Sequence, residues 1–146
     1  MIRLTALPTP LDTNQQCMIR KTVTSDHGLP CRRCLQDGRV GEEMLLLCYS
    51  PFEGVSPYTS PGPIFVHSNP CKQYQWDGAI PEQQSCRLLA IRGYDKDHMM
   101  MEYAVVEGKE LMGKAEELLS DTRVEYLLVY YAGPGCFAVR VDKQNQ

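Results

Sequence analysis

Four side chains in the middle third of the sequence could together bind a metal ion. Cys31 and Cys34 are separated by two residues, and His67 and Cys71 by three. Two cysteines at the first spacing can bind one ion from a tight knuckle of backbone, and thiolate and imidazole groups suit zinc. The sequence therefore predicts a Cys₃His zinc site, on the condition that the two pairs converge.

The residues around these candidate ligands support the prediction and also leave an alternative open. Arg32 and Arg33 lie between the first two cysteines, where positive charge favours the thiolate form that binds metal. We expect His67 to end a strand and residues 68–70 to turn the chain, so that Cys71 points back toward it. Alternatively, the cysteines pack as small apolar residues and His67 bonds to the backbone.

Other cysteine chemistry finds less support in the spacing. A thioredoxin-like pair begins a helix whose N-terminus lowers the pKa of the first thiol, but the turn residues Asp37 and Gly38 follow too soon for such a helix. The chain has no Gly-x-Ser-x-Gly motif, and no spacing selects a cysteine to act with His27, His67 or His98. No catalytic residue is therefore predicted, and enzymatic activity stays an open question.

Two further hypotheses require no metal. A pocket for a small anionic ligand could use the cationic and hydrogen-bonding side chains Arg32, Tyr58, His67 and Arg92. Arg92 would lie at the end of a strand, in a position to hold a carboxylate. The other hypothesis is an interaction module that binds a protein without catalytic chemistry.

Composition and charge restrict the partners of the chain. Its 146 residues fit a single domain, 1–146, and 43% hydrophobic and 23% charged residues are ordinary for a globular protein. The net charge of −3 and the lack of a lysine or arginine cluster argue against nucleic acid. The longest apolar runs fall short of the ~20 residues that span a bilayer, which argues against a membrane partner. An unknown small molecule or protein remains the expected partner.

Seven cysteines form an odd and large set for a chain of this length. The N-terminus has no uninterrupted apolar segment before Pro8 and Pro10, so we expect no secretory signal. The predicted location is therefore the cytoplasm, where thiols stay reduced and some of them can bind metal.

Hydrophobic patterning predicts an α+β fold with a mainly antiparallel sheet of about six or seven strands. The expected strands are residues 2–6, 18–24, 44–49, 64–67, 87–92, 99–106, 124–131 and 137–142, the second of them on weak grounds. The strand at 124–131 is apolar on both faces and should be central. One amphipathic helix, at about 108–120, should cover one face of the sheet.

Several short motifs along the chain are shared with one known family. They are Pro30-Cys31-Arg32-Arg33-Cys34-Leu35, Gly41-Glu42 before Leu45-Leu46-Leu47, Gly62-Pro63-Ile64-Phe65-Val66-His67, Cys71, Arg92-Gly93-Tyr94-Asp95 and Gly135-Cys136-Phe137. Together they make the chain resemble an uncharacterised bacterial family, domain of unknown function 1203. The resemblance covers most of the chain from residue 30 onward. It implies a compact cytosolic bacterial protein without an assigned activity, cofactor or catalytic residue.

Overall fold

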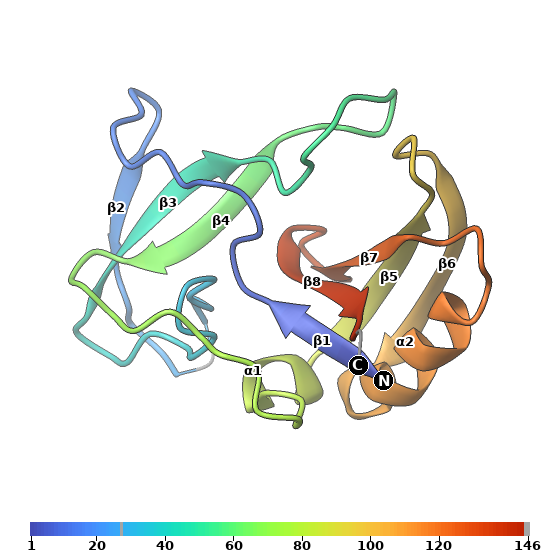
Figure 1. Cartoon of the computed structure of the whole chain (residues 1–146). Helices are drawn as coiled ribbons and strands as arrows, with labels where there is room; N and C mark the ends of the chain where they lie inside the picture. Colours follow the sequence, from blue (N-terminus) through green and yellow to red (C-terminus); the bar gives the residue numbers. More distant parts are fainter. Residues whose placement is uncertain (27, 145–146) are drawn as a thin grey trace.

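The described chain folds into eight strands arranged in two antiparallel sheets (Figure 1). The structure is a computed structural model that describes residues 1–26 and 28–144. The strands are β1 (Ile2–Thr5), β2 (Ile19–Thr22), β3 (Glu43–Tyr49), β4 (Gly62–His67), β5 (Leu88–Tyr94), β6 (Met100–Glu107), β7 (Tyr126–Tyr131) and β8 (Phe137–Lys143). The helical elements are α1 (Glu82–Ser85), the 3₁₀ turn η1 (Gly108–Glu110) and α2 (Leu111–Leu119).

The predicted fold class is confirmed, but the strands divide differently from the expectation. The large sheet has the order β1-β8-β7-β5-β6, and the small sheet has the order β2-β3-β4. The sequence predicted about six or seven strands in one sheet, whereas the described residues form eight strands in two. Hydrophobic patterning indicates strands but not their partners, which is why it could not separate the two sheets.

Strand β7 lies at the centre of the large sheet and is buried on both faces, as its continuous apolar sequence predicted. Leu127, Val129 and Tyr131 belong to the hydrophobic core that also contains the buried face of α2. The alternate side chains Tyr126, Leu128 and Tyr130 belong to a second core, shared with β3 and β4 of the small sheet. The large sheet is therefore the middle layer, with α2 on one face and the small sheet on the other.

The predicted helix at about 108–120 is confirmed as η1 followed by α2. Leu111, Ala115, Leu118 and Leu119 are its buried residues, at the spacing of one helical face. They pack in the core formed with the large sheet. Burial of each leucine contributes about 1.5–3 kcal/mol, so the helix owes its stability to packing and tolerates Gly113 on its exposed side.

The short helix α1 lies in a segment that the sequence indicated only as a polar loop. Pro81 precedes it, and its four residues, Glu-Gln-Gln-Ser, have no apolar face that could reveal a helix. Instead it buries two amides: Gln84 Nε2 donates to Tyr131 Oη at 2.8 Å, and Tyr131 Oη donates to Gln83 Oε1 at 2.6 Å. Gln83 Nε2 also donates to the carbonyl of Cys31 at 3.2 Å, so α1 supports the candidate metal-binding segment.

The ends of the described chain lie side by side because β1 pairs with β8 (Figure 1). In residues 1–26 and 28–144, no helix has the length and apolar character needed to cross a membrane.

A substitution at Gly108 tests the packing of α1. An added Cβ would overlap the carbonyl oxygen of Gln84 and lie 2.6 Å from that of Arg87. Because both obstacles are backbone atoms, we expect Gly108→Ala to lower the free energy of unfolding by about 1–3 kcal/mol. Urea unfolding monitored by tyrosine and tryptophan fluorescence measures the change.

Gly113→Ala is the matched control for this substitution. A Cβ at Gly113 meets no atom within 4 Å, and helical Ala is favoured over Gly by about 1 kcal/mol. The control should therefore be stabilised. Equal unfolding midpoints for the two variants would contradict the close packing of α1 against Gly108.

Candidate metal centre

A closed loop of backbone presents Cys31 and Cys34. This knuckle, residues 29–38, has its ends held together by the Gly38 N–H, which donates to Leu29 O at 2.9 Å. Inside it, the Cys31 N–H donates to Gln36 O and the Leu35 N–H donates to Cys31 O, both at 3.1 Å. Leu35 adopts a φ of 57°, a left-handed conformation that closes the turn. The turn replaces the helix that thiol redox catalysis would need.

The knuckle docks on β4 and so brings its cysteines to His67. Cys31 forms an isolated parallel bridge with Phe65, in which the Arg32 N–H donates to Phe65 O at 2.9 Å. Two residues further along, the His67 N–H donates to Cys31 Sγ at 3.3 Å. His67 is the last residue of β4, as the sequence predicted. The main chain therefore places imidazole and thiol side by side.

Cys71 is held over the cluster by backbone hydrogen bonds on either side of it. The Ser68 N–H donates to Glu43 O at 3.0 Å, which continues the pairing of β3 with β4 for one more residue. The Tyr74 N–H donates to Arg33 O at 2.8 Å, which attaches the segment after Cys71 to the knuckle. Because the chain is fixed at 68 and at 74, Cys71 must remain near Cys31, as the turn at 68–70 predicted.

Two of the distances between the four ligand atoms match those of a tetrahedral zinc site, and the others fall within 4.8 Å. Cys31 Sγ is 3.8 Å from Cys71 Sγ, Cys34 Sγ is 3.5 Å from His67 Nδ1, and all four atoms lie within 4.8 Å of one another. In a tetrahedral site, zinc lies about 2.3 Å from each sulfur and about 2.0–2.1 Å from the nitrogen. Two sulfur ligands are then about 3.8 Å apart, and a sulfur and a nitrogen ligand are about 3.5 Å apart. All seven cysteines are free, and a disulfide would need about 2.05 Å.

Hydrogen bonds around Cys31 favour its thiolate. The Cys34 thiol and the backbone N–H groups of Cys34, His67 and Arg33 stabilise the negative sulfur against the opposing effect of burial, and they lower the pKa of Cys31 to about 4. The contact with Cys31 and burial raise the pKa of Cys34. Burial and the charge on Cys31 raise the pKa of Cys71, which Arg33 opposes. These shifts favour the thiolate at Cys31 and the thiol at Cys34 and Cys71, so metal binding would displace the protons of these two thiols.

Glu42 and Arg33 contact the candidate ligands from outside the cluster. Glu42 Oε1 lies 3.5 Å from His67 Nε2, the ring nitrogen that faces away from the cysteines. The Arg39 N–H donates to Glu42 at 2.6 Å and lowers the pKa of that carboxyl group. A carboxylate on the outer nitrogen of a histidine ligand fixes its orientation and raises its basicity. Arg33 Nη1 donates to Cys71 Sγ at 3.7 Å and places a positive charge beside the thiols.

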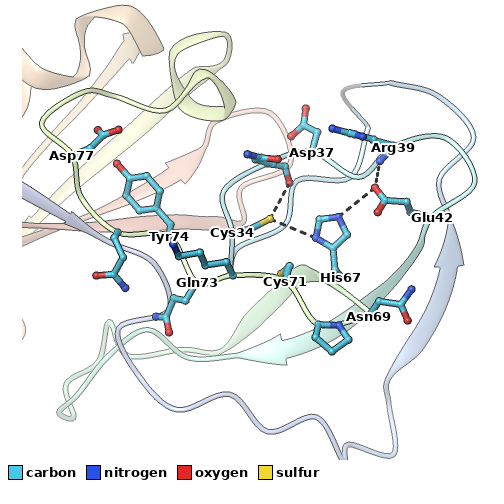
Figure 2. A pocket seen from close by; sticks show the side chains of 14 residues that line it. Cys34, Asp37, Arg39, Glu42, His67, Asn69, Cys71, Gln73, Tyr74 and Asp77 are labelled. Atoms are coloured by element: carbon cyan, nitrogen blue, oxygen red, sulfur yellow. Dashed lines mark hydrogen bonds and ion pairs between the residues drawn. The ribbon is translucent and has the colours of Figure 1, made fainter.

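Three of the four candidate ligands line a pocket of about 610 Å³. Figure 2 shows Cys34, His67 and Cys71 in its wall, with the His67 ring between the Cys34 sulfur and Glu42. Cys31 is fully buried behind them. The cluster is therefore buried on one side and accessible on the other, which gives an ion an entry path.

The residues predicted for an anionic pocket do not gather in one place. Arg32 lies in the knuckle and His67 in the cysteine cluster. Tyr58 packs with its ring 6.1 Å from that of Tyr94, and the Arg92 guanidinium lies 4.2 Å above the ring of Tyr130. In the part of the chain that the structure describes, no hydrogen bond, ion pair or ring contact joins Tyr58 or Arg92 to the other two. His27, named above among possible histidine partners, lies outside the described residues.

The two adjacent arginines of the knuckle face different surroundings. Arg33 contacts Cys71, whereas Arg32 donates to Phe137 O at 2.7 Å and to Cys136 Sγ at 2.8 Å on the large sheet. Only Arg33 therefore supplies charge to the cluster by direct contact. Sequence reasoning did not separate these roles, and it also missed Glu42. The only available signal for Glu42 was its place in the shared Gly41-Glu42 motif.

Comparison with known proteins gives a family and no activity. The family described as "Protein of unknown function (DUF1203)" matches residues 28–143, a segment that contains all four candidate ligands together with Glu42 and Arg33. No curated protein and no solved structure matches the chain. The motifs and the match over most of the sequence agree, and the chain belongs to the DUF1203 family of proteins of unknown function.

Proposed function

We propose that the protein binds one zinc ion through Cys31, Cys34, His67 and Cys71. The observation that carries the proposal is that all four ligand atoms lie within 4.8 Å of one another, and that one sulfur–sulfur and one sulfur–nitrogen distance match the edges of a zinc tetrahedron. The ligand set also favours zinc, because three thiolates and one imidazole in tetrahedral geometry suit zinc better than magnesium or calcium, which prefer oxygen.

The role that fits this ligand set best is structural. Four protein ligands fill a zinc tetrahedron and leave no position for a reacting water, unlike catalytic sites with three protein ligands. The ion would link the knuckle, the end of β4 and the segment after it, which backbone hydrogen bonds already bring together. We also propose a reducing compartment, such as a bacterial cytoplasm, because the site needs three reduced thiols.

Metal analysis of the untagged protein, purified without chelator, is the direct test. We expect about one equivalent of zinc, and a loss of most of it in Cys34→Ser and Cys71→Ser, because each substitution removes one of four ligands. Co²⁺ substitution provides a second measurement, since a tetrahedral thiolate site gives intense visible absorption bands.

Cys17→Ser and Cys48→Ser are matched controls, because both cysteines are exposed and lie outside the cluster. They should retain the zinc content of the unmodified protein. Less than about a tenth of an equivalent in the unmodified protein, or equal zinc in cluster and control variants, would rule out the proposed site.

Removal of the ion should destabilise the protein. Metal that binds only the folded state contributes about 2.7 kcal/mol when free metal is a hundredfold above Kd. For a chain of this size we therefore expect chelation to lower the midpoint of thermal unfolding by about 5–10 °C, and added zinc to restore it. Differential scanning calorimetry with and without chelator measures this shift, and superimposable curves would contradict a structural role.

Glu42→Gln tests the carboxylate that contacts His67. Loss of its charge should weaken zinc binding about 10–100-fold while one equivalent still binds at saturation, because all four ligands remain. Competition with a chromophoric chelator measures the affinity.

Glu43→Gln is the control for the Glu42 substitution. Glu43 is the next residue and bonds to Arg20 and Ser68 rather than to His67. Its substitution should leave zinc affinity unchanged. If the Glu42 and Glu43 variants bound zinc equally well, Glu42 would have no part in holding the ligand.

A further inference from the structure

A second cavity, of about 360 Å³, lies on the side of the knuckle that faces the large sheet. We call it the Arg32 pocket; its walls include Arg32 of the knuckle, Phe65 of β4, Arg87 and Leu88 at the start of β5, Tyr131 of β7, and Pro134 in the turn that follows. None of the four candidate zinc ligands lines it. Its volume falls within the usual range of small-molecule sites.

Arg32 carries a positive charge into this pocket without an acidic partner. The residue is only 1% exposed, and in residues 1–26 and 28–144 its guanidinium bonds to no carboxylate. It donates instead to the carbonyl oxygens of Phe137 and Pro30 and to Cys136 Sγ. A buried cation without a counter-charge is costly, so a negative group in the adjoining pocket would be stabilised.

The other cation of the pocket has its own counter-charge. Arg87 Nη2 pairs with Asp37 Oδ2 at 2.9 Å, outside the pocket lining. The guanidinium groups of Arg32 and Arg87 lie 5.0 Å and 5.2 Å from the centre of the Tyr131 ring. Among the residues that the structure describes, no acidic side chain lines the pocket. One uncompensated positive charge therefore remains, which favours a ligand with one negative charge.

The remaining walls favour an apolar body on that ligand. Phe65, Leu88, Pro134 and the Tyr131 ring offer hydrocarbon surface, and Leu88 is 47% exposed although it is apolar. We propose that the Arg32 pocket binds a small organic monoanion, namely a carboxylate carried on a flat or short apolar body. The carboxylate faces the two guanidinium groups, and the body covers the apolar wall.

Benzoate binding to the purified full chain tests this proposal by isothermal titration calorimetry. Benzoate should bind at least about tenfold more tightly than its neutral isostere benzamide, because a charge-assisted contact is about twice as strong as a neutral one. Inorganic phosphate tests the anion without an apolar body and should bind more weakly than benzoate. Failure of benzoate to bind up to about 10 mM, or an equal or better affinity for benzamide or phosphate, would overturn the proposal.

The Gly133→Leu variant tests whether benzoate binds in this pocket, and it leaves the buried charge of Arg32 in place. Gly133 lines the cavity, is exposed, and has no atom within 4 Å of an added Cβ, so the protein should remain folded. The new side chain should fill the mouth and weaken benzoate binding at least about tenfold.

Gly113→Leu is the matched control, since Gly113 is equally open but lies on the exposed face of α2. It should bind benzoate like the unmodified protein. Circular dichroism and zinc content establish that both variants are intact. Unchanged benzoate affinity in Gly133→Leu would place the ligand elsewhere and overturn the assignment.

Discussion

The docking of the knuckle on β4 is the contact on which the rest of the site depends. A single parallel bridge between Cys31 and Phe65 joins two segments more than thirty residues apart in the chain. It sets one thiol against the backbone of His67 and orients the knuckle so that Cys34 reaches the imidazole. On the other side of the knuckle, the same contact leaves Arg32 directed at the large sheet. Both the candidate metal centre and the Arg32 pocket therefore depend on this one bridge.

Because the knuckle docks in this way, the adjacent residues Arg32 and Arg33 direct their charges to different sides of it. A zinc ion bound by three thiolates and one imidazole would carry one net negative charge, and Arg33 would lie beside it because it contacts Cys71. Arg32 cannot offset a negative charge on the cysteine cluster, because its side chain is buried against Phe137 and Tyr131. Two residues that look equivalent in the sequence thus have separate surroundings: Arg33 lies beside the cysteine cluster, and Arg32 lies against the large sheet.

The sequence predicted those features that depend on local pattern. The strands β3, β4 and β7 contain short apolar runs, and the helix α2 has an apolar periodicity, and these patterns indicate the elements directly. The spacing of two cysteine-containing pairs was likewise sufficient to identify the four candidate ligands, because each pair is brought together by a turn of a few residues. That β4 ends at His67 followed from the residues that interrupt the strand pattern after it.

Features that depend on tertiary contacts were not accessible to the same reasoning. The polar helix α1 is stabilised by buried amides rather than by an apolar face, so its sequence resembles a loop. The division of the strands into two sheets depends on long-range pairing. The partnership of Glu42 with His67 requires the register of β3 against β4, and the separation of Tyr58 and Arg92 from Arg32 requires the position of the knuckle. None of these features is marked in the sequence by particular residue types at a fixed spacing.

The order of the ligands along the chain has a consequence for biosynthesis. All four precede β5 in the chain, so the complete set emerges from the ribosome before β5, β6, β7 or β8 does. An ion captured at that moment would fasten the knuckle to β4 while the apolar face of the small sheet still lacks its cover of Tyr126, Leu128 and Tyr130. A bound ion would then hold the knuckle and the small sheet in their mutual position until β7 is available to cover them.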